Sequence, residues 1–304
     1  MLRKIGRLFL ESNVFHLQDC IEGMMSLPEK SIDTVVTSPP YNLNIQYSKY
    51  KDKKPRDQYL SWLHDVFVGV DHCLKDDGHF FLNVGYSNID PWVGMDVANV
   101  ARDIFVLQNN IAWVKSIHIK TIRATKKQLH NTTFGHFKPI SSKRFTCPTW
   151  EHLFHFTKSG NVEIDRLAVG VKYEYYQENI RGEEDKPKSN PKDSVLYEED
   201  IEVEGGKSNL RDKGNSWFMP YETINTKDLR GNHPATFPEK LVEDCLKLTG
   251  IQNGVVLDPF MGTGTTAVAA AKNDWDFIGY DIDEEYVDFS KKRLEKELDN
   301  PLNI

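Results

Sequence analysis

A short turn in the first part of the chain carries residues that could hold an amine. Ser38-Pro39-Pro40-Tyr41 follows the β-branched apolar run 32–36, which is typical of a buried strand. Two consecutive prolines prevent both a helix and a continued strand ladder, so the chain must leave the strand in a stiff turn. Such a turn brings together a hydroxyl, a carbonyl and an aromatic ring, which suits a flat base with an exocyclic amine. The alternative is an ordinary proline-rich turn with a half-buried tyrosine.

A glycine-rich turn, Gly262-Thr-Gly264, lies between a predicted strand at 255–258 and a predicted helix at 265–272. Glycines allow a ligand to approach the backbone, and the first helical amides face an anionic group. Asp281 ends the next predicted strand, where such folds place an acid for ribose hydroxyls. A phosphate P-loop is excluded because Gly-Lys-Ser/Thr is missing, and a dinucleotide fits less well because a third glycine is missing. A nucleoside with a carboxylate tail, such as S-adenosylmethionine, fits; a turn without a ligand is the alternative.

The elements around these turns alternate between strand and helix, which predicts an α/β protein with a mostly parallel sheet. Lys75-Asp76-Asp77-Gly78 is expected to end the second helix through its glycine. Open sheets of this kind bind ligands at the carboxyl ends of their strands. The predicted strands are 14–17, 32–36, 79–84, 111–114, 150–157, 255–258 and 276–281, and the predicted helices are 21–27, 58–74, 93–105, 238–249, 265–272 and 284–298.

Composition and cysteine spacing exclude several classes of protein. The chain of 304 residues has 39% hydrophobic and 27% charged residues, as a globular protein does, and no run of 18 apolar residues that could span a membrane. Its four cysteines are far apart and form no CxxC pair, which predicts neither a zinc site nor a disulfide framework and favours a reducing cytoplasm. His152 and His155 alternate with apolar residues, so they indicate a strand and no metal site is predicted.

The net charge of −7 conceals a strongly basic segment. Residues 115–147 contain eight Lys or Arg and no Asp or Glu, whereas residues 174–204 contain eleven acids and four bases. An acid-free basic segment is the footprint expected of a surface that follows phosphates, and the alternative is a solvated loop. The predicted DNA-binding residues are Lys126, Lys127, Lys143 and Arg144.

Both turns together resemble a known family. Ser38-Pro39-Pro40-Tyr41 followed much later by Asp258-Pro-Phe-Met-Gly-Thr-Gly-Thr-Thr266 is similar to the amino-group DNA methyltransferases that place the catalytic motif before the cofactor motif. His233-Pro-Ala-Thr-Phe-Pro238 resembles an additional cofactor segment of that family. The resemblance implies an S-adenosylmethionine-dependent, Rossmann-like α/β sheet with an inserted target-recognition region. It divides the chain into a catalytic half (1–158, with a DNA-facing loop at 115–147), a target-recognition insert (159–231) and a cofactor-binding half (232–304).

The resemblance also assigns roles to residues. The catalytic residues it implies are Ser38, Pro39, Pro40 and Tyr41. The cofactor residues it implies are Asp258, Phe260, Gly262, Gly264, Thr265, Thr266 and Asp281, with His233, Pro234, Ala235 and Phe237 closing over the cofactor and Asp19 and Cys20 flanking its adenine.

The implied reaction is methylation of a base that has been extruded from the duplex. Ser38 and the Pro39 carbonyl would accept hydrogen bonds from the amine, and no covalent enzyme intermediate would form. C5-cytosine methylation is rejected because it needs a nucleophilic cysteine in a Pro-Cys motif, and the chain has only the reversed Cys147-Pro148. In this family Ser opens the motif more often in cytosine-N4 enzymes and Asp in adenine-N6 enzymes. Ser38 therefore favours cytosine N4, with adenine N6 as the alternative.

Further expectations concern partners and location. The resemblance implies double-stranded DNA as substrate, a prokaryotic cytoplasm, a cognate restriction endonuclease that acts on the same site, and a homodimer. Two other classes remain open on the residues alone. One is a methyltransferase that acts on RNA or protein through a similar turn. The other is a DNA-binding relative without activity, against which the intact motifs argue.

Overall fold

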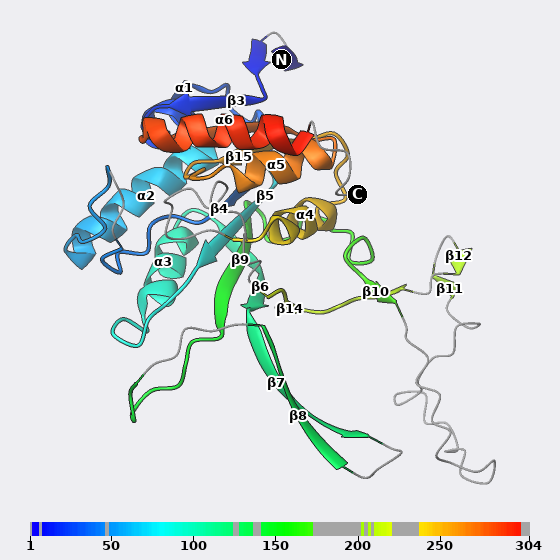
Figure 1. Cartoon of the computed structure of the whole chain (residues 1–304). Coiled ribbons are helices and arrows are strands. Elements are labelled where there is room, and N and C mark those ends of the chain that lie inside the picture. The colour runs from blue at the N-terminus through cyan, green and yellow to red at the C-terminus, as the bar shows by residue number, and fades with distance from the viewer. Residues whose placement is uncertain are drawn as a thin grey trace.

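One mixed sheet runs through the molecule (Figure 1). The computed structural model describes residues 2–5, 8–45, 49–123, 128–135, 141–172, 202–203, 206–207, 210–220 and 237–298. Within these residues the strands of the sheet, in spatial order, are β14 (Ser216–Phe218), β6 (Val106–Val114), β9 (Trp150–Thr157), β5 (Leu74–Val84), β4 (Ile32–Thr37), β15 (Val255–Asp258), β16 (Asp276–Asp281) and β3 (Val14–Leu17).

Neighbouring strands in this sheet run parallel, except that β9 is antiparallel to both β5 and β6. The predicted α/β fold with a mostly parallel sheet is thereby confirmed. β4 and β15 are direct neighbours, with Val35 opposite Leu257. Because parallel strands end at the same edge of a sheet, the turns that follow β4 and β15 leave the sheet side by side.

Helices cover both faces of the sheet and enclose two hydrophobic cores. One face packs against α1 (Cys20–Ser26), α2 (Arg56–Cys73) and α3 (Val93–Arg102), and the other against α4 (Glu239–Leu248), α5 (Thr265–Lys272) and α6 (Glu284–Leu298). Successive strand residues alternate between the cores: Val35 belongs to the first and Val36 to the second. This burial on both faces explains why the strands are continuous apolar runs.

The predicted glycine cap at the end of the second helix is wrong. α2 ends at Cys73, and β5 begins at Leu74 without an intervening turn. Leu74 pairs with Ile32, but the next pair is Thr34 with His79, so residues 75–78 form an irregularity inside the strand. A glycine beside charged residues occurs both at helix ends and in β-bulges. Here β5 pairs with β4 on both sides of Gly78, so the glycine lies in a bulge.

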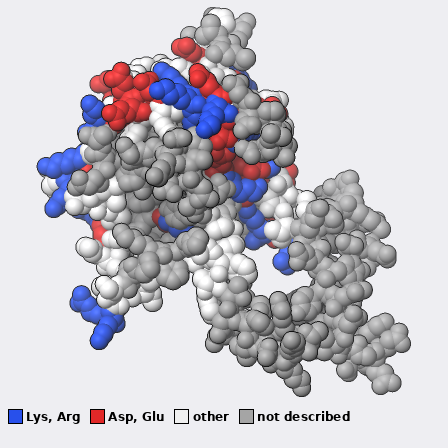
Figure 2. Space-filling view, in the orientation of Figure 1, with Lys and Arg blue, Asp and Glu red and all other residues white. Residues whose placement is uncertain are grey.

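The basic segment folds partly as a hairpin, which projects away from the sheet (Figure 1). Its strands β7 (Ser116–Arg123) and β8 (Gln128–Gly135) pair with each other and with no strand of the main sheet. Lys126 and Lys127 lie outside the described residues. Lys143 and Arg144 are exposed in the segment that returns to β9, and in Figure 2 a group of blue side chains projects at the lower left.

Small paired strands occupy the N-terminal end of the chain and the predicted insert. They are β1 (Leu2–Ile5) with β2 (Leu8–Glu11), β10 (Val171–Lys172) with β13 (Leu210–Arg211), and β11 (Glu202–Val203) with β12 (Gly206–Lys207). β14 also lies within residues 159–231, but it is the edge strand of the main sheet. In the described part of the chain, no helix is long and apolar enough to cross a membrane, and no His, Cys, Asp and Glu cluster is arranged to hold a metal ion.

Two buried histidines predict a loss of stability at acid pH. His79 Nδ1 lies 3.0 Å from His155 Nε2, and Asn109 contacts the other ring nitrogen of His155 at 2.9 Å. Burial lowers the pKa of His79 to about 4 and that of His155 to about 3. Because the unfolded rings take up protons below pH 6.5 and the folded rings do not, stability is fully present above pH 6.5 and is lost as the pH falls towards 4.

We expect the free energy of unfolding to fall by about 1 to 3 kcal/mol between pH 7 and pH 5.5 through these rings. Urea denaturation at the two pH values measures the change. The control is the double variant His79→Gln/His155→Gln, which cannot titrate at these positions and should show a smaller difference. An equal difference in the control would assign the acid sensitivity to other groups.

Candidate functional site

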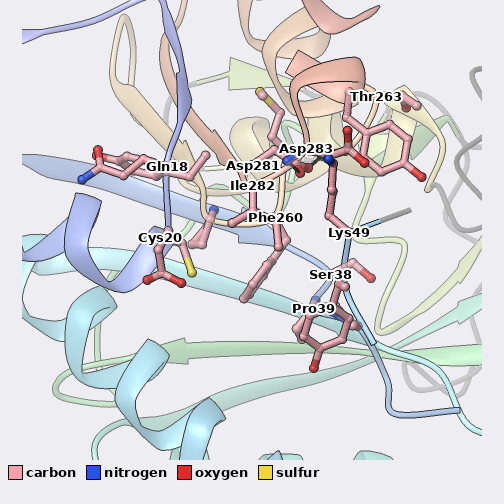
Figure 3. A pocket seen from close by; sticks show the side chains of 18 of the residues that line it. Gln18, Cys20, Ser38, Pro39, Lys49, Phe260, Thr263, Asp281, Ile282 and Asp283 are labelled. Atoms are coloured by element: carbon pink, nitrogen blue, oxygen red, sulfur yellow. Dashed lines mark hydrogen bonds between the residues drawn. The ribbon is translucent and has the colours of Figure 1, made fainter. Parts of the chain in front are cut away.

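A cavity of about 270 Å³ opens at the carboxyl ends of β4, β15 and β16 (Figure 3). Both predicted turns contribute to its wall, the first with residues 38–41 and the second with residues 259–263. Residues 281–283, at the end of β16, also line the cavity, and in Figure 3 Phe260 lies between Asp283 and the pair Ser38 and Pro39. Segments that are more than two hundred residues apart in sequence therefore share one site.

A buried carboxylate ties the two turns together. Asp258 accepts hydrogen bonds from Thr37 Oγ1 at 2.7 Å and from Thr266 Oγ1 at 2.6 Å, and its Oδ1 also accepts from the Phe260 amide at 3.0 Å. Burial raises the pKa of Asp258, and these three hydrogen bonds oppose the rise. Thr37 is the last residue of β4, directly before the catalytic turn. Asp258 thus fixes the distance between the two turns.

Other hydrogen bonds hold the catalytic turn in place. Tyr59 Oη of α2 donates to the Pro40 carbonyl at 2.8 Å. The buried carboxylate of Asp52 accepts from the amides of Asn42, Leu43 and Ile45 at 2.8 to 3.1 Å. The described part of the loop that follows the turn is therefore anchored by one side chain rather than free in solvent.

The glycine turn has the conformation that the sequence predicts. Gly264 has φ +75°, and an added Cβ would lie 2.8 Å from Ser290 Cβ, so a larger residue would be strained there. Gly264 precedes α5, which begins at Thr265. Arg293 of α6 donates to the Thr265 hydroxyl at 3.0 Å and to the Thr263 carbonyl at 3.2 Å. Arg293 of α6 thus holds the turn in place through hydrogen bonds. Thr263 and Thr265 themselves line the cavity.

Asp281 stands at the end of β16 and faces the cavity. Its oxygens accept from the Gly262 amide at 3.0 Å and the Asp283 amide at 2.9 Å. Burial raises the pKa of Asp281 to about 6, and the two amide hydrogen bonds oppose the rise. Asp283 Oδ2 is buried without a hydrogen-bond partner in the described part of the chain. Two carboxylates with unused acceptor capacity are suited to the hydroxyls of a ribose.

The cavity chemistry fits S-adenosylmethionine. Apolar and aromatic side chains supply flat surfaces, while acceptors gather at Asp281 and Asp283 and the exposed amine of Lys49 can face an anion. Asp19 caps α1, accepting from the Ile21 amide at 2.9 Å, and lies at the rim beside Cys20. The remaining apolar lining residues include Phe237, Pro259, Phe260, Ile282 and Tyr286.

The predicted site residues divide into three groups. Those that line the cavity are Ser38, Pro39, Pro40, Tyr41, Asp19, Cys20, Phe237, Phe260, Gly262, Thr265 and Asp281. Gly264 of the glycine turn, and Asp258 and Thr266, which bond to each other next to this turn, do not line the cavity. His233, Pro234 and Ala235 fall outside the described residues.

Several lining residues carry no sequence signal of their own. Lys49, Tyr50 and Lys54 come from the loop after the catalytic turn, and Trp62 comes from α2. Lys54 Nζ lies 4.7 Å from the Trp62 ring centroid, so these two lining residues form a cation–π contact in the cavity wall. In a single sequence Trp62 is one more apolar position on a helix. Asp283, by contrast, could have been predicted as a lining residue from the sequence, because it lies two positions after Asp281.

Comparisons with known proteins agree with this geometry. The model of a family described as DNA methylase, which covers N6 and N4 amino-methyltransferases, matches residues 32–292. The chain is 28% identical over 310 residues to the type II methyltransferase M.BglII of Bacillus subtilis. This alignment covers 96% of this chain and 71% of that protein.

Two solved structures share the fold. The cytosine-N4-specific PvuII DNA methyltransferase superposes with a TM-score of 0.62 at 20% identity, covering 94% of this chain and 89% of that one. A putative DNA modification methylase from Thermus thermophilus, solved with S-adenosyl-L-methionine, gives a TM-score of 0.56 at 21% identity over 93% of this chain and 95% of that one. Because the family match spans most of the chain and includes both turns of the cavity, the protein is a member of the N6/N4 amino-group DNA methylase family.

Proposed function

We propose that this protein methylates cytosine N4 in double-stranded DNA. The observation that carries the choice of base is Ser38, which opens the catalytic turn and lines the cavity. A hydroxyl in this position is the more frequent choice of cytosine-N4 enzymes, and a carboxylate that of adenine-N6 enzymes. The family contains both activities, so adenine N6 is the second candidate.

S-adenosylmethionine is the cofactor that the family uses. When bound, it supplies an activated methyl group. Asp281 would accept from the ribose hydroxyls, Asp19 and Cys20 would flank the adenine, and Phe260 and Phe237 would cover its faces. His233, Pro234 and Ala235 would close the site from the segment that precedes Phe237.

The chain's own part in the reaction is to receive and orient the base. A stacked base is out of reach, so it must be extruded at a cost of a few kcal/mol, which stacking on the Tyr41 ring partly offsets. Ser38 Oγ and the Pro39 carbonyl would accept the amine hydrogens and draw the nitrogen lone pair out of conjugation with the ring. Both turns are held by buried hydrogen bonds, so these acceptors are positioned before the base arrives.

Mass spectrometry of nucleosides tests the choice of base. The protein is expressed in a host without modification methylases, and the digested DNA is compared with DNA from the same host carrying the Ser38→Ala variant. We expect N4-methylcytosine only with the unchanged protein. N6-methyladenine would establish the second candidate. If neither DNA contains a modified base, the proposal is contradicted and RNA or protein becomes the candidate substrate.

Biological context is proposed from relatives. The relative from Bacillus subtilis is a type II methyltransferase, and we propose that this protein likewise protects sites that a cognate restriction endonuclease cleaves. We also propose that residues 159–231 read the target sequence between the catalytic half, 1–158, and the cofactor half, 232–304, and that the enzyme forms a homodimer.

Phosphate contact is proposed for the basic segment. Lys143 and Arg144 are exposed, and Lys126 and Lys127 lie close to them in sequence. Each phosphate contact contributes about 0.9 to the slope of log K against log salt concentration, so replacing all four residues by Gln should reduce the slope by up to about 4. Fluorescence anisotropy with a labelled duplex at 50 to 200 mM salt measures it.

The control for this measurement replaces four exposed lysines of other surfaces, Lys30, Lys240, Lys291 and Lys296, by Gln. We expect it to leave the slope within about one of the original value. An equal reduction in both variants would show that overall charge acts, and not the basic segment.

A further inference from the structure

A polar cluster from three strands of the main sheet, or from their ends, contacts the Tyr41 side chain of the catalytic turn. Its members are Asn83 near the end of β5, Lys115 directly after β6, and Glu151 near the start of β9. All three are at least largely buried: Asn83 is 2% exposed, and the side chains of Lys115 and Glu151 are each 13% exposed. Asn83 and Glu151 meet at the hydroxyl group of Tyr41, which in turn contacts Ser38, and Lys115 pairs with Glu151. The inference below rests on the proposed function.

The orientation of the Asn83 amide is fixed by the backbone. Its Nδ2 donates to the His152 carbonyl at 2.9 Å, and a carbonyl can only accept. Asn83 Oδ1 therefore faces Tyr41 Oη, at 3.1 Å, as an acceptor.

Glu151 presents a second acceptor to the same hydroxyl. Its Oε1 forms an ion pair with Lys115 Nζ, which keeps the carboxylate in place, and its Oε2 lies 3.3 Å from Tyr41 Oη. A phenol has one proton, and here that proton has two acceptors, Asn83 Oδ1 and Glu151 Oε2, to serve.

The direction of the remaining hydrogen bond follows. Ser38 Oγ and Tyr41 Oη are 2.7 Å apart, and either could donate when the pair is taken alone. Because the Tyr41 proton is directed to Asn83 and Glu151, Ser38 must donate to Tyr41. The serine proton is then taken up by Tyr41 Oη, and the lone pairs of Ser38 Oγ remain to accept from an amine, which is the role that the proposed reaction requires of this residue.

We propose that Glu151 and Asn83, with Lys115 supporting Glu151, are positioning residues that set the direction of the Ser38–Tyr41 hydrogen bond and so make Ser38 an acceptor towards the target amine. The packing around them leaves little freedom. A Cβ at Gly85 would lie 2.7 Å from Tyr41 Cε2 and 2.9 Å from Glu151 Oε1, so only glycine allows this close approach.

A double-mutant cycle on the rate of methyl transfer tests the proposal. The rate is measured in a single turnover, from tritiated S-adenosylmethionine to genomic DNA of a host without modification methylases. We expect Tyr41→Phe, which removes only the hydroxyl, and Glu151→Gln each to lower the rate by about tenfold, the worth of one hydrogen bond. Because Glu151 acts through the Tyr41 hydroxyl, the double variant should also lose about tenfold rather than a hundredfold. Affinities for cofactor and DNA should change by less than about twofold.

Two further variants separate this effect from folding. Lys115→Met/Glu151→Gln also removes the ammonium whose carboxylate the single variant replaces, and it should show the same loss of rate as Glu151→Gln. Asp244→Asn breaks a comparable buried ion pair with Lys213, distant from the cavity, and should leave the rate unchanged at a temperature where it is folded. A Glu151→Gln rate equal to that of the original protein, or a double variant that loses about a hundredfold, would overturn the proposal.

Neutron diffraction from the deuterated, cofactor-free protein reads the hydroxyl directions without any activity. We expect the Ser38 deuteron to point at Tyr41 Oη and the Tyr41 deuteron to point towards Asn83 and Glu151. A Tyr41 deuteron directed at Ser38 would overturn the inference even if DNA is methylated. The expected arrangement in a protein that methylates no DNA would instead contradict the proposed function alone.

Discussion

Replacing Ser38 by Ala should lower the rate of methyl transfer by about 10² to 10³, the usual loss when one aligned hydrogen-bonding group is removed from a reacting centre. Ser38 lines the cavity. Hydrogen bonds of Tyr59 and Asp258 hold the turn in place, so removal of the Ser38 hydroxyl should leave the conformation of the remaining site unchanged. Affinity for S-adenosylmethionine should change little, because the predicted cofactor contacts come from residues outside this turn. Single-turnover kinetics and calorimetric titration measure the two effects separately.

The matched control is Ser26→Ala. Ser26 is exposed on α1, and its hydroxyl donates to the Glu22 carbonyl of the same helix at 2.8 Å. It should retain the original rate. If Ser38→Ala methylates DNA within threefold of the original rate, or loses cofactor binding in parallel with activity, Ser38 is not an acceptor for the amine.

Replacing Asp281 by Asn should weaken cofactor binding by about 10- to 100-fold at pH 7.5, since a hydrogen bond to a charged group is worth about 1.5 to 3 kcal/mol. The affinity of the unchanged protein should also depend on pH. Burial holds the pKa of Asp281 at about 6, so the carboxylate is ionised at pH 7.5 and protonated at pH 5. Affinity for S-adenosylhomocysteine should therefore fall as the pH drops through 6.

Asp281→Asn has no proton to gain at this position, so its affinity should vary less between pH 7.5 and pH 5. Asp19 and Asp283 line the same cavity and are unchanged in the variant, which makes the difference between the two pH profiles specific to Asp281. Asp288→Ala, exposed on α6, is the control and should bind as the original protein does. Identical pH profiles for the original protein and Asp281→Asn would show that Asp281 does not receive the ribose.

Much of the sheet could be predicted from the sequence because its signals are local. A β-branched run before two prolines defines β4 and its turn, and Asp258 to Thr266 define a strand, a glycine turn and a helix. The adjacency of these turns needs pairing between β4 and β15, which no local pattern shows. The family resemblance implies this adjacency, and the pairing of β4 with β15 supplies the physical reason.

What could not be predicted depends on contacts distant in sequence. Gly78 has the same neighbours as a helix cap, and only the partner strand makes it part of a bulge. Lys115 contributes to the basic segment in the sequence, yet it is neutralised by Glu151, which lies outside that segment. Asp258 has the sequence signature of a cofactor residue, but its oxygens are occupied by Thr37 and Thr266.

The central claim is that the turn at Ser38 and the turn at Gly262 form a single cleft for the methyl donor and the base. A crystal structure with S-adenosylhomocysteine tests it most directly. We predict ligand density in the cavity, in contact with residues of both turns, 38–41 and 259–263, and with residues 281–283. A ligand bound away from either turn, or crystals of folded protein that take up none at saturating concentration, would contradict the claim.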